Sequence, residues 1–486
     1  MIVRWVCKKD NKKWLYPVEK CIYCKGPITK QIGKKIKVTG ITKVNIPSPM
    51  HPITPYNVLL LEDEYGNRMP KKTMRDYNIG DDYLIEKAKT DGAVVITKIK
   101  YDLREALIES LGLLKSTDVK ENDKILVKPS IIEPAYGYQA VTTNPKLVDE
   151  IISYLKDKRI RDIIVAEQSM PKENTVDAAE KCGILDVCEK HNVPFIDLGK
   201  TDYVKKSFNG FDFKIAKPAL DRKVINVPVM KTNSQIGISG AVENMVRVVD
   251  EDTQKRMFAD DIENKMPLLI KALPKFLSVG DATIGMHGQG PTILGEPAFL
   301  NMIFLSNDPV ALDTVFTEVG MLVKPNYIKN AAEVGAGNDN IQNIEIVGED
   351  IRALRFHLKP ADRNVSAHPN IKFIDGKANP YIFNSALKIT ARLVGILGEE
   401  INLAIGTLLT EEMVKGKKRL VAYGNEAIVA LKNLGIKPLA EIQEGTDNLE
   451  KVMLLKSILE NPDKKKVTVG DKIKSKVAKF GVKIDK

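Results

Sequence analysis

From about residue 92 the chain alternates short apolar runs with amphipathic stretches of ten or more residues, and this alternation limits the possible folds. The apolar runs have the length of buried strands: KILVK (124–128), DIIVAE (162–167), PFIDL (194–198), KVINVPVM (223–230), KFLSVGD (275–281) and NMIFLS (301–306). Helical runs such as 145–158 and 175–191 lie between them. The pattern predicts an α/β domain over residues 92–345, with an open, largely parallel sheet and helices on both faces.

Charged residues lie at or just beyond the carboxyl ends of these strands, where open α/β sheets bind their ligands. Two lysines suit an anionic substrate, and carboxylates suit proton transfer or a hard divalent cation. We therefore expect catalytic roles for Lys128, Glu167, Lys231 and Asp281. A divalent cation could be held by Glu167, Asp281, Asp308 and Asp313. Two alternatives are that Asp308, which precedes a proline, caps a helix and that Lys128 lies on the surface.

Two glycine-containing segments follow predicted strands. The segment 278–295, SVGDATIGMHGQGPTILG, suits main-chain contacts to a ligand because glycine lets backbone N–H groups face a bound molecule. The segment from Lys231, KTNSQIGISGAVENMV, leads into a helix near Ala241 whose first N–H groups could hold a phosphate or carboxylate. Tight turns and an ordinary capped helix are the alternatives. The expected ligand-binding residues are Thr142, Thr143, Ser239, Gly240, Asn244, Gly285, His287, Gly288 and Gly290.

Six ordered motifs carry a family resemblance: ILVKPS, TTNPKLVDEII, VAEQS, NVPVMKTNSQIGISGAVENMV, VGDATIGMHGQGPTILG and NDPVALDTV. Through them the central region resembles the domain of unknown function 362 family, some members of which carry iron–sulfur segments. Asn233 stands where the family often has histidine, and Ser130 where asparagine is common, so chemistry that needs that histidine is not implied. We expect no iron–sulfur cluster, because Cys182 and Cys188 are the only cysteines after residue 24.

Three of the five cysteines lie near the N-terminus, as Cys7, Cys21 and Cys24. Cys21 and Cys24 form a C-x-x-C turn of the kind that binds zinc, and Asp10 takes the second position of the other turn, CKKD. A zinc site would therefore consist of Cys7, Asp10, Cys21 and Cys24, with His51 as a further ligand from outside. In the alternative, the metal is lost and Trp5, Trp14 and Pro17 pack the remnant.

Short β-rich segments separated by turns follow the cysteines and predict a small barrel: IKVTGITKVNI, PYNVLLLEDE and DYLIE. Together with the cysteine turns, residues 1–90 resemble the zinc-ribbon and OB-fold proteins associated with thiolases and hydroxymethylglutaryl-CoA synthase. That resemblance implies recruitment of an acyl carrier, a coenzyme A ester or a thiolase-like partner enzyme. An OB-fold also serves as a nucleic-acid platform, and residues 1–43 carry 12 Lys and Arg against 2 Asp and Glu.

The net charge of +11 is concentrated at the two ends of the chain. Residues 1–90 carry +9 and the Lys-rich tail, 464–486, carries +7, which leaves −5 for the rest. This distribution disfavours nucleic-acid binding by the central domain, although the ends could bind a polyanion. Residues 346–463 predict a small helical or α/β region, with helices around 381–409, a strand RLVAYG and two further helices. Gly424, after that strand, marks either a second small ligand site or a strand-to-helix turn.

These patterns lead us to expect a cytoplasmic enzyme of unknown reaction that binds an anionic small molecule. One alternative is a non-catalytic scaffold for a thiolase-like complex, and another is a nucleic-acid binder. The N-terminal sequence has no apolar secretory region. The most apolar run, 389–409, contains Arg392, Glu399 and Glu400, so we expect no membrane span. The partner could also be a second copy of the chain, and the high Lys and Glu content is compatible with a thermophilic, for example archaeal, source.

Overall fold

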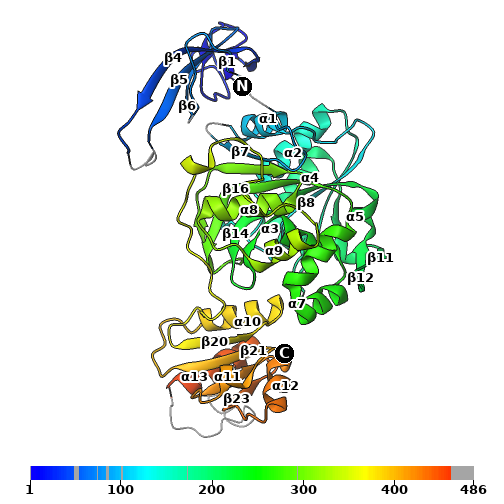
Figure 1. The fold of residues 1–486 in the computed structure, drawn as a ribbon. Coiled ribbons are helices and arrows are strands. Elements are labelled where there is room, and N and C mark those ends of the chain that lie inside the picture. Colours follow the sequence, from blue (N-terminus) through cyan, green and yellow to red (C-terminus); the bar gives the residue numbers. More distant parts are fainter. Residues whose placement is uncertain are drawn as a thin grey trace. The chain divides into compact units, whose positions relative to one another are not determined.

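The computed structural model describes residues 2–48, 54–73, 75–83, 87–99, 102–171, 173–292 and 294–460 (Figure 1). One unit consists of the chain up to Gln254 together with Glu263–Pro360. The other consists of Lys255–Ile262 and the chain from Ala361 onwards. His51 and the basic tail, 464–486, lie outside the described residues.

The first unit is built around a mixed sheet in the order β10-β9-β8-β13-β16-β18-β7-β19. Most neighbouring strands are parallel, but β18 is antiparallel to both β16 and β7. The α/β prediction is therefore confirmed, with one strand reversed. The strands are β7 (Val94–Lys98), β8 (Lys124–Pro129), β9 (Asp162–Glu167), β10 (Phe195–Asp197), β13 (Lys223–Val227), β16 (Leu277–Gly288), β18 (Met302–Ser306) and β19 (Ile346–Gly348).

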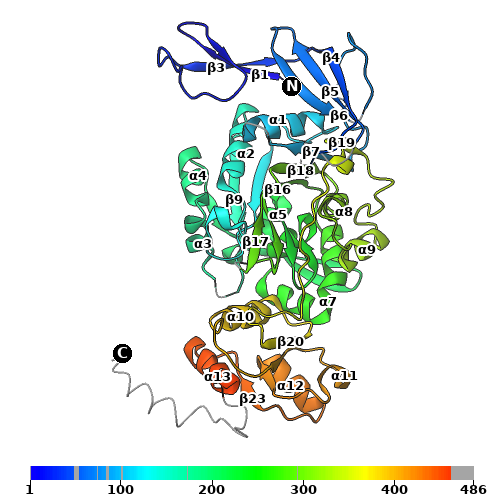
Figure 2. The ribbon, with the colours of Figure 1, turned by 90° about the vertical axis from the view of Figure 1, so that its left-hand side faces the viewer.

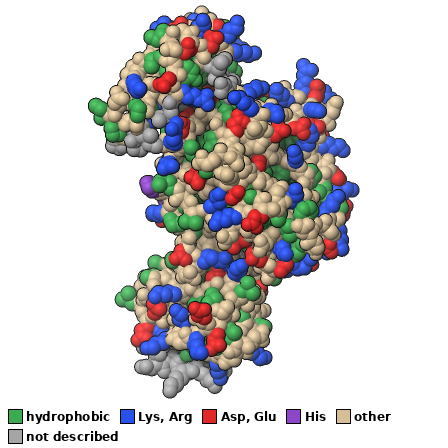
Figure 3. Space-filling model, in the orientation of Figure 1, with side chains coloured by type: hydrophobic (Ala, Val, Ile, Leu, Met, Phe, Trp, Pro, Cys, Tyr) green, Lys and Arg blue, Asp and Glu red, His purple; other side chains and the backbone are tan. Residues whose placement is uncertain are grey.

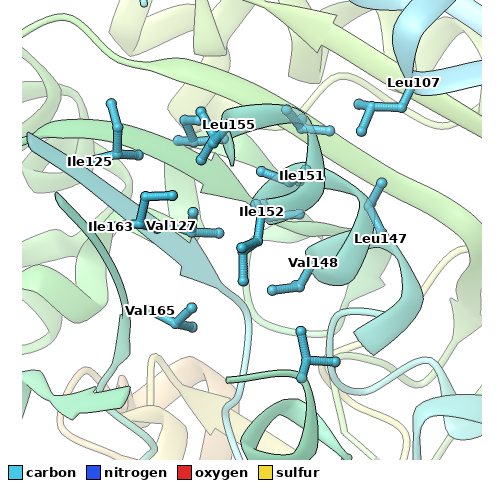
Figure 4. Packing of buried hydrophobic residues seen from close by; sticks show 14 of the residues in the cluster. Leu107, Ile125, Val127, Leu147, Val148, Ile151, Ile152, Leu155, Ile163 and Val165 are labelled. Carbon is cyan, nitrogen blue, oxygen red and sulfur yellow. The ribbon is translucent and has the colours of Figure 1, made fainter. Parts of the chain in front are cut away.

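Helix α2 (Pro145–Asp157) shows how the sequence produces the packing. Asn144 caps it by accepting a hydrogen bond from Lys146 N, and Pro145 suits its first position. Its apolar residues recur every three or four positions, so they form one face that is buried against β8 and β9 (Figure 4). This face consists of Leu147, Val148, Ile151, Ile152 and Leu155.

Helices cover both sides of this sheet, as Figure 2 shows. On β18, Ile303 and Leu305 belong to the core cluster that includes residues of α1 (Leu103–Leu113), α2, α3 (Thr175–Lys181) and α4 (Ile184–His191). Phe304 lies between them and packs edge-on against Phe316 of α8 (Pro309–Gly320). Successive strand residues point to opposite faces, so the two contacts mark two helical layers. The remaining helices are α5 (Lys217–Asp221), α6 (Ala241–Asn244) and α9 (Asn326–Glu333) in this unit, and α7 (Glu251–Ala272), of which Lys255–Ile262 belongs to the second unit.

The N-terminal residues form two small antiparallel sheets. The first contains β1 (Ile2–Cys7), β2 (Lys13–Trp14) and β3 (Ile28–Gly33), and the second contains β4 (Ile36–Val44), β5 (Tyr56–Asp63) and β6 (Arg68–Thr73). The two sheets share no strand within the described residues, and the expected last strand lies partly outside them. Small antiparallel β structure is therefore confirmed, whereas the closed barrel stays a prediction.

The second unit contains a parallel four-stranded sheet with helices between its strands, so this region is α/β rather than helical. The expected helical run to residue 409 is wrong in part, because Ile401–Gly406 forms a central strand. A short apolar run of that kind suits a buried strand as well as a helix. The elements are β20 (Ile371–Gly376), α10 (Pro380–Ala391), β21 (Ile401–Gly406), α11 (Glu411–Val414), β22 (Leu420–Tyr423), α12 (Asn425–Asn433), β23 (Ala440–Ile442) and α13 (Asn448–Glu460).

The first unit ends later in the chain than the sequence predicted. It extends past residue 345 to Pro360, because β19 pairs with β7. Gly424, with φ of 88°, lies at the start of α12 and makes the strand-to-helix turn. None of the helices in the described part of the chain has the length and apolarity that crossing a membrane requires.

Candidate functional site

Lys128 and Glu167 form an ion pair at the carboxyl edge of the central sheet. Lys128 lies near the end of β8 and Glu167 ends the neighbouring parallel strand β9. Both side chains are fully buried, and Lys128 Nζ donates a hydrogen bond to Glu167 Oε2. The sequence-based expectation that strand ends bring these two residues together is met, since adjacent parallel strands end at the same edge.

Lys231 and Arg247 add two further buried cations. Lys231, in β14 (Val229–Asn233), is 1% exposed and its Nζ donates to Val141 O at 2.8 Å. Arg247 lies in the 3₁₀ turn Met245–Val248 and donates to Gln254 Oε1 at 2.6 Å. The charges of Glu243 and Glu133 raise the pKa of Lys231, and those of Arg247 and Glu167 also influence it, so these groups lie close enough to interact. We call Lys128, Glu167, Lys231 and Arg247 the charge cluster.

Burial shifts the protonation equilibria of the charge cluster toward neutral forms. It raises the pKa of Glu167 to about 7, against the attraction of Lys128, which lowers it. Burial lowers the pKa of Lys231 to about 8, and it also lowers the pKa values of Lys128 and Arg247. Glu167 and Lys231 can therefore both change charge near neutral pH, which is the property that proton transfer needs.

The hydrogen bonding of the charge cluster is incomplete. Glu167 Oε1 and Arg247 Nε are buried and have no hydrogen-bond partner within the described residues. Lys231 Nζ, which can donate three hydrogen bonds, makes one with those residues. Buried polar atoms normally have a partner, so these atoms indicate a place for an ordered water molecule or a ligand.

Next to the charge cluster, the side-chain amides of Asn226 and Asn244 have hydrogen-bond partners in the protein. Asn244 Nδ2 donates to Asn226 Oδ1 at 2.8 Å, and Asn226 Nδ2 donates to Ala241 O at 2.9 Å. Asn244 thus ties α6 to β13, whereas the sequence suggested a ligand contact. Its side chain holds in position the segment that carries Arg247.

Asp281 occupies the same edge of the sheet but contacts other groups. Its carboxylate accepts hydrogen bonds from Asn144 N at 2.7 Å, from Thr283 N at 3.0 Å and from the Thr283 hydroxyl at 2.6 Å. Burial raises the pKa of Asp281, and the Thr283 hydroxyl opposes that shift. The contacts that the structure gives Asp281 join β16 to the start of α2, and none of them is to the charge cluster.

The structure does not bring the four predicted cation ligands together. Asp308 caps α8, with bonds of 2.9 Å from Val310 N and Ala311 N. It follows β18, whose reversed direction places it at the opposite edge of the sheet from Glu167. Asp313 accepts from Ala241 N at 2.6 Å, Val242 N at 3.1 Å and the Tyr327 hydroxyl at 2.9 Å. Each of these carboxylates thus accepts hydrogen bonds from a different set of protein groups.

A comparison with protein families covers this site. Residues 125–318 match the family model of the Domain of unknown function (DUF362). The match confirms the resemblance of the central region and includes all four residues of the charge cluster. It does not reach the N-terminal residues, so the resemblance to zinc-ribbon and OB-fold proteins stays a prediction. No curated protein matches the chain.

Within the DUF362 match, the expected glycine loop is mostly strand. Strand β16 runs to Gly288 and turns back into β17 (Gly295–Ala298). A Cβ atom at Gly290 would lie 2.1 Å from Thr232 O, and one at Gly285 would lie 2.8 Å from Met230 O. Close backbone packing therefore explains why glycine is needed at both positions.

The other predicted ligand-binding residues in the DUF362 match also have protein partners. His287 lies on this hairpin, where its Nδ1 accepts from Lys359 N at 3.3 Å. Thr143 Oγ1 donates to Val227 O at 2.7 Å, and Ser239 Oγ accepts from Asn233 Nδ2 at 2.9 Å. Thr142 Oγ1 is the exception, because it is buried without a hydrogen-bond partner in the described residues.

Outside the DUF362 match, the N-terminal cysteines form a possible metal site. One ligand atom from each of Cys7, Asp10, Cys21 and Cys24 lies within 4.8 Å of all the others. It is the one group of three or more potential ligands of this kind in the described part of the chain. Cys7 Sγ and Cys24 Sγ are 3.4 Å apart, near the separation of about 3.8 Å that two thiolates have on a tetrahedral zinc ion.

Proposed function

We propose that the DUF362 region is an enzyme that binds a small organic anion at the charge cluster and moves a proton to or from it. The observation that supports this most directly is the incomplete hydrogen bonding of Lys231, Arg247 and Glu167 in a fully buried position. The charges of Glu243 and Glu133 also act on Lys231, so nearby carboxylates offset the three cations. An anion would supply the acceptors that Lys231 and Arg247 lack.

The proposed roles follow from the shifted pKa values and the contacts. Lys231 and Arg247 would bind the anionic group, because both have donors left over. Glu167 would accept or donate the proton, since its pKa of about 7 suits both directions. Lys128 would act as a positioning residue that holds Glu167 Oε2 and leaves Oε1 free for the ligand.

A ligand at the charge cluster would lie near Glu243, which is partly exposed. Glu243 influences the pKa values of Lys128, Lys231 and Arg247. We propose that the anion reaches the charge cluster past Glu243, with a shift of the segment that provides Val141 O. An entering oxygen would take over the hydrogen bond that Lys231 now donates to Val141.

A thermal-shift screen tests the proposal. The probes are small carboxylic acids, phosphate esters and coenzyme A thioesters, each added to the whole chain. We expect one class to raise the melting temperature by several degrees, because a ligand at one hundred times its Kd stabilises by about 2.7 kcal/mol. Lys231→Gln should abolish the shift, whereas Lys359→Gln, at an exposed lysine that pairs with Glu296 of the β16–β17 hairpin, should keep it. A shift that survives Lys231→Gln would contradict the proposal.

We also propose that Cys7, Asp10, Cys21 and Cys24 bind one zinc ion, which would tie the two N-terminal turns together. The supporting observation is the approach of all four ligand atoms within 4.8 Å. Elemental analysis should find about one equivalent of zinc in the purified chain and none after Cys21→Ser. Cys182→Ser, at a buried cysteine of the central domain, serves as the matched control and should leave the zinc content unchanged.

Recruitment of an acyl carrier or partner enzyme by the N-terminal region is a separate proposal. It rests on the sequence resemblance, and the coenzyme A thioesters in the screen test it. A thermal shift that Cys21→Ser removes and Lys231→Gln leaves in place would support recruitment by the N-terminal region.

A further inference from the structure

The two turns that carry the possible zinc ligands also carry exposed cations and an aromatic ring. Lys8 and Lys9 lie between Cys7 and Asp10, and Tyr23 lies between Cys21 and Cys24. All three are exposed, Tyr23 by 68%. Because the four ligand atoms approach within 4.8 Å, the two turns lie side by side.

Contacts between the turns place more lysines on the same surface. Lys12 Nζ lies 3.4 Å from the centroid of the Tyr23 ring. The side chain of Lys9 packs beside Gly26, which follows the exposed Lys25. We call Lys8, Lys9, Lys12, Tyr23 and Lys25 the knuckle face. Figure 3 shows Lys and Arg side chains on the N-terminal part of the chain, at the top of the view.

The positive charge of the knuckle face is not balanced by nearby acids. Residues 1–43 contain two acidic residues, Asp10 and Glu19, and Asp10 belongs to the possible zinc site. Where the structure describes the chain, none of the four lysines of the knuckle face takes part in an ion pair, unlike Lys415, which pairs with Glu411 on α11. Binding of a chain of negative charges to such a surface is electrostatically favourable.

We propose that the knuckle face binds single-stranded nucleic acid, with the lysines on phosphates and the Tyr23 ring stacked on a base. Repeated cations beside an exposed ring match the two groups that recur along such a strand, and any base can stack on an aromatic side chain. Ile22 and Leu15 are the exposed aliphatic side chains close by in sequence, 52% and 43% exposed. Two separated aliphatic residues offer little apolar area for a lipid bilayer, so we favour nucleic acid over a membrane surface.

Fluorescence anisotropy with the full chain and a labelled oligouridylate of about 16 nucleotides tests this inference. We expect log Kd to vary linearly with log salt. Lys8→Gln/Lys9→Gln/Lys12→Gln should weaken binding at least tenfold and reduce the salt slope by about 2, as three lost phosphate contacts require. Tyr23→Ala should weaken binding by about 5- to 150-fold, and Tyr23→Phe should restore most of the affinity.

Matched variants elsewhere separate the knuckle face from general charge. Lys415→Gln/Lys417→Gln/Lys418→Gln removes the same charge from another exposed cluster, and Tyr138→Ala removes a ring that is 67% exposed. Both should bind the oligonucleotide like the wild type. The inference is overturned if the two triple variants lose affinity equally. It is also overturned if the knuckle variants weaken binding to phosphatidylserine vesicles but not to RNA. Unchanged zinc content and circular dichroism confirm that the variants fold.

Discussion

The charge cluster and the knuckle face place lysines in opposite environments. Lys128 and Lys231 are buried at the carboxyl edge of the central sheet, whereas Lys8, Lys9 and Lys12 are exposed around the N-terminal turns. In the interior, a charge without full hydrogen bonding costs folding free energy. On the surface, water solvates the ammonium groups and their mutual repulsion is small. Substitutions should therefore change folding stability in the first region and binding alone in the second.

The largest effect is expected from separating Lys128 and Glu167. Glu167→Gln leaves the Lys128 ammonium buried without its counter-ion, so it should lower the free energy of unfolding by about 3–5 kcal/mol. The double variant Lys128→Met/Glu167→Leu removes both charges and should lie close to the wild type. Chemical denaturation measures both. If Glu167→Gln lowers the free energy of unfolding by less than about 1 kcal/mol, the buried ammonium of Lys128 does not need Glu167 as its counter-ion.

A gain in stability is expected from Lys231→Met. Because burial lowers the pKa of Lys231 to about 8, the folded protein below that pH carries an ammonium at a free-energy cost. Its removal should stabilise the fold by about 1–3 kcal/mol at pH 7. The gain should shrink as the pH rises from 8 and vanish above the ordinary pKa of 10.5, where lysine is neutral in both states. Denaturation at pH 7 and pH 10.5 tests this, with Lys359→Met as an exposed control.

A smaller effect is expected at Asp281. Asp281→Asn keeps one acceptor oxygen where the carboxylate offers two to Asn144 N and Thr283, so it should destabilise the fold by about 1–2 kcal/mol. The thermal shift caused by a ligand should persist, because the contacts of Asp281 lie outside the charge cluster. Loss of the shift with unchanged stability would place Asp281 in the binding site, as the sequence alone suggested.

The smallest change in stability is expected on the knuckle face. Replacing Lys8, Lys9 and Lys12 with glutamine should alter the free energy of unfolding by no more than about 0.5 kcal/mol. The same variant should lose affinity for the oligonucleotide, so stability and binding separate. A large loss of stability would mean that these lysines contribute to the fold, and the contrast between the two regions would fail.

The sequence predicted Lys128 and Glu167 because consecutive βα units place neighbouring strand ends at one edge. It could not predict the position of Asp308, since NMIFLS has the same pattern whichever direction the strand takes in the sheet. The direction of β18 follows from its pairing with β16 and β7, which is a tertiary property. The strand at 401–406 was missed for a similar reason, because its burial depends on neighbours on both sides.

Arg247 was missed although the sequence contains a signal. It stands alone among the apolar residues Met245, Val246, Val248 and Val249, where an exposed arginine is not expected. Its partner Gln254 lies on α7, seven positions later, and that contact appears only in the folded chain. The glycines of 278–295 were identified correctly as special positions, but backbone packing and ligand binding require the same residue type, so the sequence cannot separate the two.

The contact between Asp313 and the first N–H groups of α6 has a consequence for what this segment can bind. A Cβ atom at Gly240 would lie 2.1 Å from Asp313 Oδ1, so the glycine makes room for a carboxylate that belongs to the chain itself. A tethered group competes at an effective concentration that can reach the millimolar range or more. A soluble phosphate or carboxylate present at lower concentration would not displace it. The motif SGAVEN thus has the form of an anion-binding loop whose anion is intramolecular.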